Sequence, residues 1–112
     1  MNVLTKGRAK VSSLLVGLNA PTPINGIQMG SVTLTPTAIP ANSKGSVTFA
    51  LAGAFVGDFV DMQQPVALEN SLLPLGAAVT STGTVTVWFH NNTGTPVTGA
   101  SLVWLYLWIK LT

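Results

Sequence analysis

Apolar and polar residues alternate along several short stretches of the chain, and this alternation predicts β-strands. Residues 46–51 alternate serine, threonine and alanine with valine, phenylalanine and leucine, and residues 84–90 follow a similar pattern. Because successive side chains of a strand point to opposite faces, each stretch predicts a strand with one buried face. A shorter alternation over 32–35 predicts an earlier strand, and residues 55–60 predict a further one with a bulge at Gly57.

The C-terminal stretch, residues 101–112, differs from these because it is apolar at nearly every position. As a strand it would divide its side chains between two faces, with Leu102, Trp104, Tyr106 and Trp108 on one and Val103, Leu105, Leu107 and Ile109 on the other. A strand that is apolar on both faces has to be covered on both. We expect the domain's own core to cover one face, and a second layer, a partner subunit or an assembly to cover the other.

Glycine, proline, asparagine and hydroxyl residues separate the predicted strands. They predict a loop over 36–45, a turn at 81–83 and another at 91–94, whereas residues 63–76 are expected to form a long irregular connection. Short strands with turn signals every ten or so residues are typical of an all-β fold. We therefore predict a small antiparallel β-sandwich or jelly-roll-like domain over residues 27–112.

Residues 1–26 are predicted to form an extended arm that leaves this domain. Pro21 and Pro23 disfavour a helix and favour extended or turn geometry. Before them lie a basic cluster and an apolar run, which we expect to contact a partner: Lys6, Arg8, Lys10, Leu14, Leu15 and Val16. A basic start followed by a short apolar run is also typical of a secretory signal peptide, but two serines interrupt the run, so we favour the arm.

The composition points toward assembly. Only 7% of the residues are charged, against about 25% in a typical soluble domain, while 47% are hydrophobic. A surface so poor in charge is expected to be covered by neighbours. A membrane-spanning helix needs about 20 consecutive apolar residues, which the chain lacks, so we expect no membrane partner. The net charge of +2 comes mainly from the N-terminal cluster, and without a broad basic face we expect no nucleic-acid partner either.

Groups able to do chemistry are scarce. The chain has no cysteine, so disulfides and thiolate chemistry are excluded, and its acids and its single histidine are Asp58, Asp61, Glu69 and His90. Two carboxylates three positions apart in a strand point to opposite faces, which opposes a glycosidase pair, and the three acids match no EF-hand calcium loop. His90 could act as the base for a serine nucleophile, but the chain has no Gly-x-Ser-x-Gly motif to supply such a serine. We expect no enzymatic activity, no cofactor and no metal. The sequence Asn91-Asn92-Thr93 fits a glycosylation signal, but we interpret it as a turn.

The three tryptophans allow two interpretations. Trp88, Trp104 and Trp108 could stack on sugar rings, as exposed aromatic residues of carbohydrate-binding modules do. They could instead pack in a contact between subunits, because aromatic residues are enriched in the cores of such contacts. We favour the second interpretation.

Three segments of the chain carry a resemblance to a known group of proteins. They are GDFV at 57–60, TGTVTVWF at 82–89 and NNTGTPVT at 91–98, and a hydrophobic C-terminal strand follows them. In this pattern, residues 31–110 resemble small all-β virion proteins of tailed bacteriophages, namely capsid decoration or cement proteins and head- or tail-fibre modules. The resemblance implies a structural protein without catalytic residues, often a homotrimer, whose partner is the major capsid protein or another virion protein.

The leading hypothesis is therefore a decoration protein that binds the outer capsid surface of a virion and stabilises it. Its predicted partner contacts are the six arm residues named above together with Trp104, Tyr106 and Trp108. One alternative is a fibre or adhesin module that binds a host glycan. Another is a tail or connector component that forms a closed ring.

Overall fold

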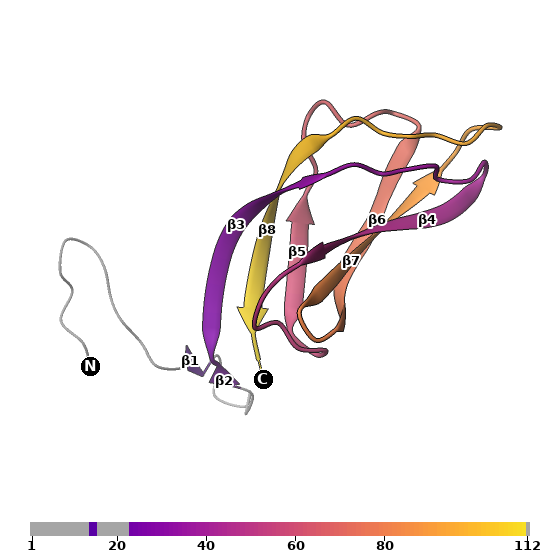
Figure 1. The fold of residues 1–112 in the computed structure, drawn as a ribbon. Coiled ribbons are helices and arrows are strands. Elements are labelled where there is room, and N and C mark those ends of the chain that lie inside the picture. The colour runs from indigo at the N-terminus through magenta and orange to yellow at the C-terminus, as the bar shows by residue number, and fades with distance from the viewer. Residues whose placement is uncertain (1–13, 16–22, 112) are drawn as a thin grey trace.

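The computed structural model describes residues 14–15 and 23–111, which form strands, turns and loops with no helix among them (Figure 1). The strands are β1 (Leu14–Leu15), β2 (Pro23–Ile24), β3 (Gly26–Leu34), β4 (Ser43–Ala50), β5 (Phe59–Gln63), β6 (Leu72–Ser81), β7 (Thr84–Asn91) and β8 (Leu102–Lys110). The predicted all-β class is confirmed. Most of the predicted arm, residues 1–26, lies outside the described residues. Within its described part, β1 pairs with β2 in antiparallel fashion.

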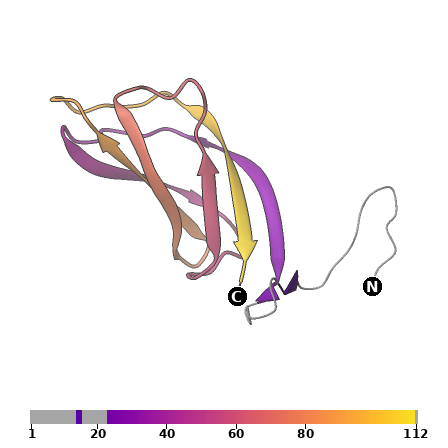
Figure 2. The ribbon, with the colours of Figure 1, turned by 180° about the vertical axis from the view of Figure 1, so that it is seen from behind.

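Two three-stranded antiparallel sheets make up the body of the domain. One has the strand order β3-β8-β5 and the other has the order β4-β7-β6. Figures 1 and 2 show the two sheets from opposite sides, lying as two layers. The chain changes sheet four times, between β3 and β4, β4 and β5, β5 and β6, and β7 and β8. In each sheet the middle strand pairs on both of its sides. β8 and β7 are thus the central strands.

The core lies between the sheets and follows the predicted alternation. Val85, Val87 and Phe89 of β7 are at most 1% exposed, and Trp104 of β8 is equally buried. The rings of Phe89 and Trp104 meet edge to face, with their centroids 5.6 Å apart. Such a pair adds about 0.5–1.5 kcal/mol beyond the burial of its area. The central strands therefore hold the two layers together through their largest side chains.

One strand was wrongly predicted as part of an irregular connection. β6 begins at Leu72, inside the stretch 63–76, although Pro74 and Gly76 read as strand breakers. β6 is an edge strand, so a proline that cannot donate a hydrogen bond is tolerated there. The pairing of β6 with β7 shifts register between Pro74 and Gly76, which accommodates both residues as an irregularity within the strand.

The strand predicted over 55–60 is also wrong in its first half. β5 starts only at Phe59, and a turn precedes it. The backbone N–H of Asp58 donates to the carbonyl of Phe55 at 3.0 Å, and the N–H of Phe55 donates to Asp58 Oδ2 at 3.1 Å. Gly57 has φ +105°, a left-handed conformation that glycine adopts easily and that here makes a turn instead of a bulge.

β3 carries a glycine whose missing side chain makes room for an aromatic ring. Gly30 pairs with Tyr106 of β8, and a Cβ built at Gly30 would overlap the hydroxyl end of that ring. The Tyr106 hydroxyl also accepts a hydrogen bond from Gln28 Nε2 at 2.9 Å, which holds the ring across β3. The close approach of the ring therefore depends on glycine at position 30.

We expect Gly30→Ala to lower the free energy of unfolding by about 1–3 kcal/mol, because the added methyl displaces a packed ring. Gly26→Ala is the matched control in the same strand, since its Cβ would meet only Lys110 Cβ at an ordinary 3.6 Å. Urea denaturation of both variants measures the difference. Equal stability of the two variants would contradict the proposed role of the Tyr106 ring.

Candidate assembly surface

β8 is buried on one face and exposed on the other. Trp104, Tyr106 and Trp108 point into the core and are 1%, 9% and 8% exposed, whereas Val103 and Leu105 are 59% and 46% exposed. The prediction that the domain's own core covers one face of this strand is confirmed. The core covers the tryptophan face, whereas on the aliphatic face Val103 and Leu105 are exposed and Leu107 and Ile109 are half-buried.

The pairing of β8 with its two neighbours extends this open face over the whole sheet. Because residues paired across antiparallel strands share a face, the register places four rows side by side: Ile27, Ile109 and Phe59; Met29, Leu107 and Asp61; Ser31, Leu105 and Gln63; and Thr33 with Val103. The row nearest the β3 start is wholly apolar, and polar residues enter toward the other end. We call the apolar members of these rows the apolar sheet face: Ile27, Met29, Phe59, Val103, Leu105, Leu107 and Ile109.

The first half of β3 turns its apolar side chains away from the core. Ile27 and Met29 are 59% and 73% exposed, while Gln28 and Gly30 lie on the side of Tyr106 and Trp108. An antiparallel sheet with one solvated face normally has apolar residues inside and polar residues outside. β3 has the reverse pattern in its first half, so the first sheet exposes large apolar side chains on its outer face.

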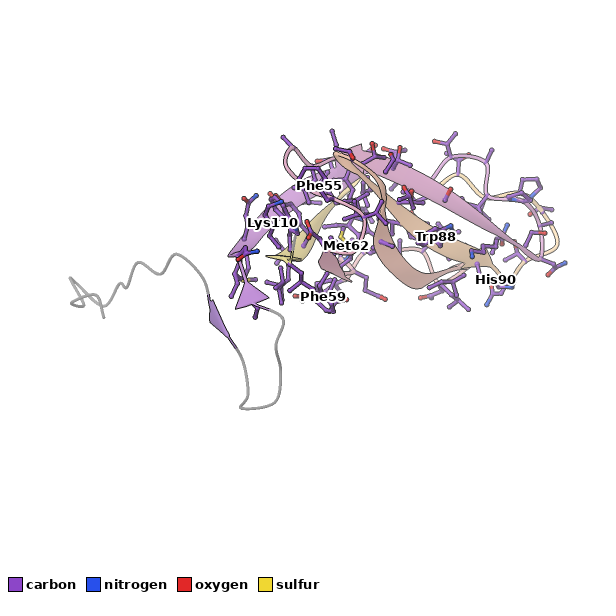
Figure 3. The ribbon with its side chains drawn as sticks, turned by 90° about the horizontal axis from the view of Figure 1, so that it is seen from below. Phe55, Phe59, Met62, Trp88, His90 and Lys110 are labelled. Atoms are coloured by element: carbon purple, nitrogen blue, oxygen red, sulfur yellow. The ribbon has the colours of Figure 1, made fainter. Side chains whose placement is uncertain are left out.

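The outer face of the second sheet provides an internal comparison. There β4 and β7 present Ser46, Thr48 and Thr86, and the Thr86 hydroxyl lies 2.7 Å from that of Thr80 in a hydrogen bond. Lys44 Nζ lies 5.1 Å from the centre of the ring of Trp88, a half-buried residue that Figure 3 labels. On β4 and β7 this face has the hydroxyl and charged residues expected of a solvated sheet, and its exposed apolar residues, Leu73 and Leu75, lie on the edge strand β6. The first sheet differs because its exposed apolar residues extend over the central strand as well.

The partner contacts predicted from the sequence change accordingly. Trp104, Tyr106 and Trp108 form part of the core, because the bulkier set of β8 side chains fills the space between the layers. Lys6, Arg8, Lys10 and Val16 lie outside the described residues, and Leu14 and Leu15 form β1. The same strand still supplies a candidate contact, but through its opposite face.

Sequence reasoning missed Ile27, Met29 and Phe59 as surface candidates. The predicted first strand covered only 32–35, so the alternation of Ile27 and Met29 with Gln28 and Gly30 was not used. That alternation is the signal in the sequence that could have identified Ile27 and Met29 as residues of one strand face. No local pattern marks Phe59, because only its pairing with Ile109 brings it to this face.

The acidic residues do not gather into a catalytic or metal-binding site. Asp58 is buried and Asp61 is exposed on the outer face (Asp61 Oδ1 accepts the N–H of Met62 at 3.0 Å), so the pair does not converge. Glu69 Oε1 accepts the N–H of Ala100, in the loop before β8, at 2.7 Å. Within residues 14–15 and 23–111, no three histidine, cysteine, aspartate or glutamate side chains are grouped so that they could hold a metal ion.

Asp58 instead joins the loop before β5 to the end of β8. Its Oδ2 accepts the indole N–H of Trp108 at 3.1 Å, and its Oδ1 accepts the N–H of Leu111 at 2.9 Å. Lys110 Nζ lies 4.0 Å from Oδ2, donates to the carbonyl of Gly53 at 2.7 Å and sits 4.4 Å from the centre of the Phe55 ring (Figure 3). These contacts stabilise the end of the first sheet that carries the wholly apolar row of Ile27, Ile109 and Phe59.

The asparagine of the glycosylation signal is a structural residue. Asn91 is fully buried, its Nδ2 donates to the carbonyls of Ile39 and Thr95, and its Oδ1 accepts from the N–H and hydroxyl of Thr93. The folded chain therefore does not present the Asn91 amide to a glycosylating enzyme. The predicted turn at 91–94 forms around this side chain.

Comparison of the chain with protein-family models, with curated proteins and with solved structures finds no match. The described residues include no helix long and apolar enough to span a bilayer. The class that can be stated is an antiparallel all-β domain of two three-stranded sheets, one of which has an exposed apolar outer face.

Proposed function

We propose that this chain is a structural virion protein, a capsid decoration or cement protein that binds the outer surface of a bacteriophage capsid as a small homo-oligomer and stabilises it. The observation that supports the proposal is the apolar sheet face, on which Met29 is 73% exposed and Val103 and Ile27 are each 59% exposed. Burying such residues contributes about 25 cal/mol per Å², so a chain with this face gains stability when it is built into an assembly.

The proposal also covers the architecture of the domain. We place the two sheets in the class of small β-sandwich or jelly-roll-like domains, since their facing sides share one core. Rigid layers of this kind suit a part that is added to a shell in many copies. The scarcity of charge, 7% of the residues, fits a surface that is largely occupied by neighbours.

The N-terminal residues supply the second contact of the proposed function. Lys6, Arg8 and Lys10 would meet acidic capsid surface, and the apolar run that includes Leu14, Leu15 and Val16 would lie on a capsid subunit or on a neighbouring copy. Ordering such a segment costs conformational entropy. Binding of several linked copies to a regular lattice offsets this cost, because each later contact is intramolecular.

Deletion of residues 1–22 tests this role of the arm. We expect the shortened chain to lose binding to particles and to keep its melting temperature, because β3 starts at Gly26 and the N–H of Asn25 still donates to the carbonyl of Lys110 at 2.7 Å. Co-sedimentation with particles that lack the protein measures binding. The charge control replaces Lys6, Arg8 and Lys10 by glutamine, which should weaken binding most at low salt. Particle binding by the shortened chain at the level of the full chain would contradict the proposal.

A glycan-binding module is the second candidate, and Trp88 is the one of the three tryptophans that is accessible enough to support it. Trp104 and Trp108 are buried in the core, so neither can stack on a sugar ring. Trp88 is half-buried on the outer face of the second sheet, beside Ser46. Binding on a glycan array that Trp88→Ala abolishes would favour this candidate over the decoration protein, and a blank array would exclude it.

A further inference from the structure

We infer that the apolar sheet face is the contact between copies of this chain, with the same face of each copy directed at the symmetry axis of a closed oligomer. The inference rests on the assembly role proposed above, and it names the partner of that surface as a further copy of this chain. It is argued from the area of the face, from its charge and from the distribution of its residues over the three strands.

The area of the face matches one side of a stable protein contact. Its five exposed members, Ile27, Met29, Phe59, Val103 and Leu105, are between 46% and 73% exposed. For side chains of this size the exposed surface amounts to roughly 500 Å², which is at the upper end of what a monomer usually displays. A standard contact buries about 800 Å² on each partner, and about two-thirds of that area is apolar in homodimers. The apolar sheet face supplies that share.

The chemistry of the face favours a protein partner of the same kind over other occupants. Its rows contain one ionisable residue, the acidic Asp61, and no basic residue. An anionic lipid surface is bound through lysine and arginine beside the apolar residues, and these are missing here. A sugar ring requires an exposed aromatic platform, whereas the face has only Phe59 at its edge. Identical apolar faces complement each other without any charge to be matched.

The arrangement of residues over the strands allows the faces of several copies to meet. Leu105 and Val103 lie on the central strand β8, and Asp61 lies on the edge strand β5, so the middle of the face is free of charge. Two sheet faces pack about 10 Å apart through interdigitating apolar side chains. With the centres of the faces in contact, Asp61 of each copy remains at the rim, where water can still solvate it. Closed cyclic symmetry then buries every copy's face equally.

The mass of the purified full chain in solution, measured by light scattering over a range of concentrations, tests the inference. We expect an oligomer of the 11.6 kDa chain, and we expect Leu105→Lys and Met29→Lys each to raise its dissociation constant at least 100-fold. Both side chains point outward, so the circular dichroism spectra should stay unchanged. Leu73→Lys is the matched control: Leu73 is 45% exposed, against 46% for Leu105, but belongs to the second sheet.

Mixing tests whether the faces meet. Leu105→Lys and Leu105→Glu should each be dissociated alone and should associate when mixed, because opposite charges then face each other. A monomer at every concentration, an oligomer that survives Leu105→Lys, or no association on mixing would each overturn the inference. Particle binding by a chain that stays monomeric would overturn it while leaving the capsid-binding role intact. Self-association without particle binding would contradict the proposed function and leave this inference intact.

Discussion

Asp58→Asn is expected to lower the free energy of unfolding by about 3 kcal/mol, although the two side chains have the same shape. The carboxylate of Asp58 is fully shielded from solvent, and both of its oxygens accept hydrogen bonds. The donors are the N–H groups of Phe55 and Leu111 and the indole N–H of Trp108. These donors come from the loop before β5 and from the end of β8, so one side chain joins two distant parts of the chain.

An amide cannot replace this carboxylate in either orientation. Oδ2 accepts from Phe55 and Trp108, and Oδ1 accepts from Leu111, so the NH₂ group of asparagine would face at least one N–H donor whichever way it is turned. A buried donor left without its acceptor costs about 1–3 kcal/mol. The change also removes the partner of Lys110, whose Nζ lies 4.0 Å away.

Guanidinium denaturation measures the loss, and Asp61→Asn is the control. Asp61 is exposed, and its bond to the N–H of Met62 is local, so we expect its replacement to change the stability by less than about 0.5 kcal/mol. If the two variants were equally stable, the hydrogen bonds of Asp58 would not contribute as argued.

Asn91→Asp is the second change with a large expected effect, also about 3 kcal/mol at neutral pH. Asn91 is fully buried at the end of β7, and its Nδ2 donates to the carbonyl of Ile39 at 3.0 Å and to that of Thr95 at 2.8 Å. Aspartate would place a carboxylate oxygen against two carbonyl oxygens. Both carbonyls would lose their donor, and a charge would be buried without a counter-ion.

The loops near Asn91 should respond together. Ile39 and Val97 exchange backbone hydrogen bonds, so Asn91 supports a bridge between the loop after β3 and the loop before β8. We expect hydrogen exchange at both loops to accelerate in Asn91→Asp. Asn92→Ala is the control, because Asn92 is exposed and its backbone N–H, which donates to Ser71, is retained. Protection that stayed unchanged in Asn91→Asp would contradict the role assigned to this amide.

The sequence predicted β4, β7 and β8 because each of them carries an uninterrupted pattern. Hydroxyl and apolar residues alternate over 46–49 and 84–87, and the apolar C-terminal stretch is too long and too rich in β-branched and aromatic residues to be a loop. The sequence did not predict β6, because Pro74 and Gly76, judged with their sequence neighbours alone, indicate a break in a strand. Their tolerance depends on β6 lying at a sheet edge, which is a property of the assembled sheet.

The turn at Phe55–Asp58 shows a different limit of structure prediction from the sequence. Phenylalanine, valine and glycine in this stretch fit a strand with a bulge as well as they fit a turn. The turn forms because Asp58 accepts hydrogen bonds from Trp108 of β8 and from Leu111 directly after it, 50 and 53 positions away. Local propensity carries no information about such distant partners.

Two conclusions follow from the amino-acid order alone: the chain is an all-β protein, and its last strand is apolar on both faces. Period-two alternation separates the side chains of β8 into two sets, but it does not say which set points inward. That choice is made by packing, because Trp104, Tyr106 and Trp108 fill the space between the sheets and meet Phe89 and Phe49 there. The extent of the outer face is likewise a product of strand pairing, since only the register of β3 and β5 on β8 brings Ile27 and Phe59 beside Ile109.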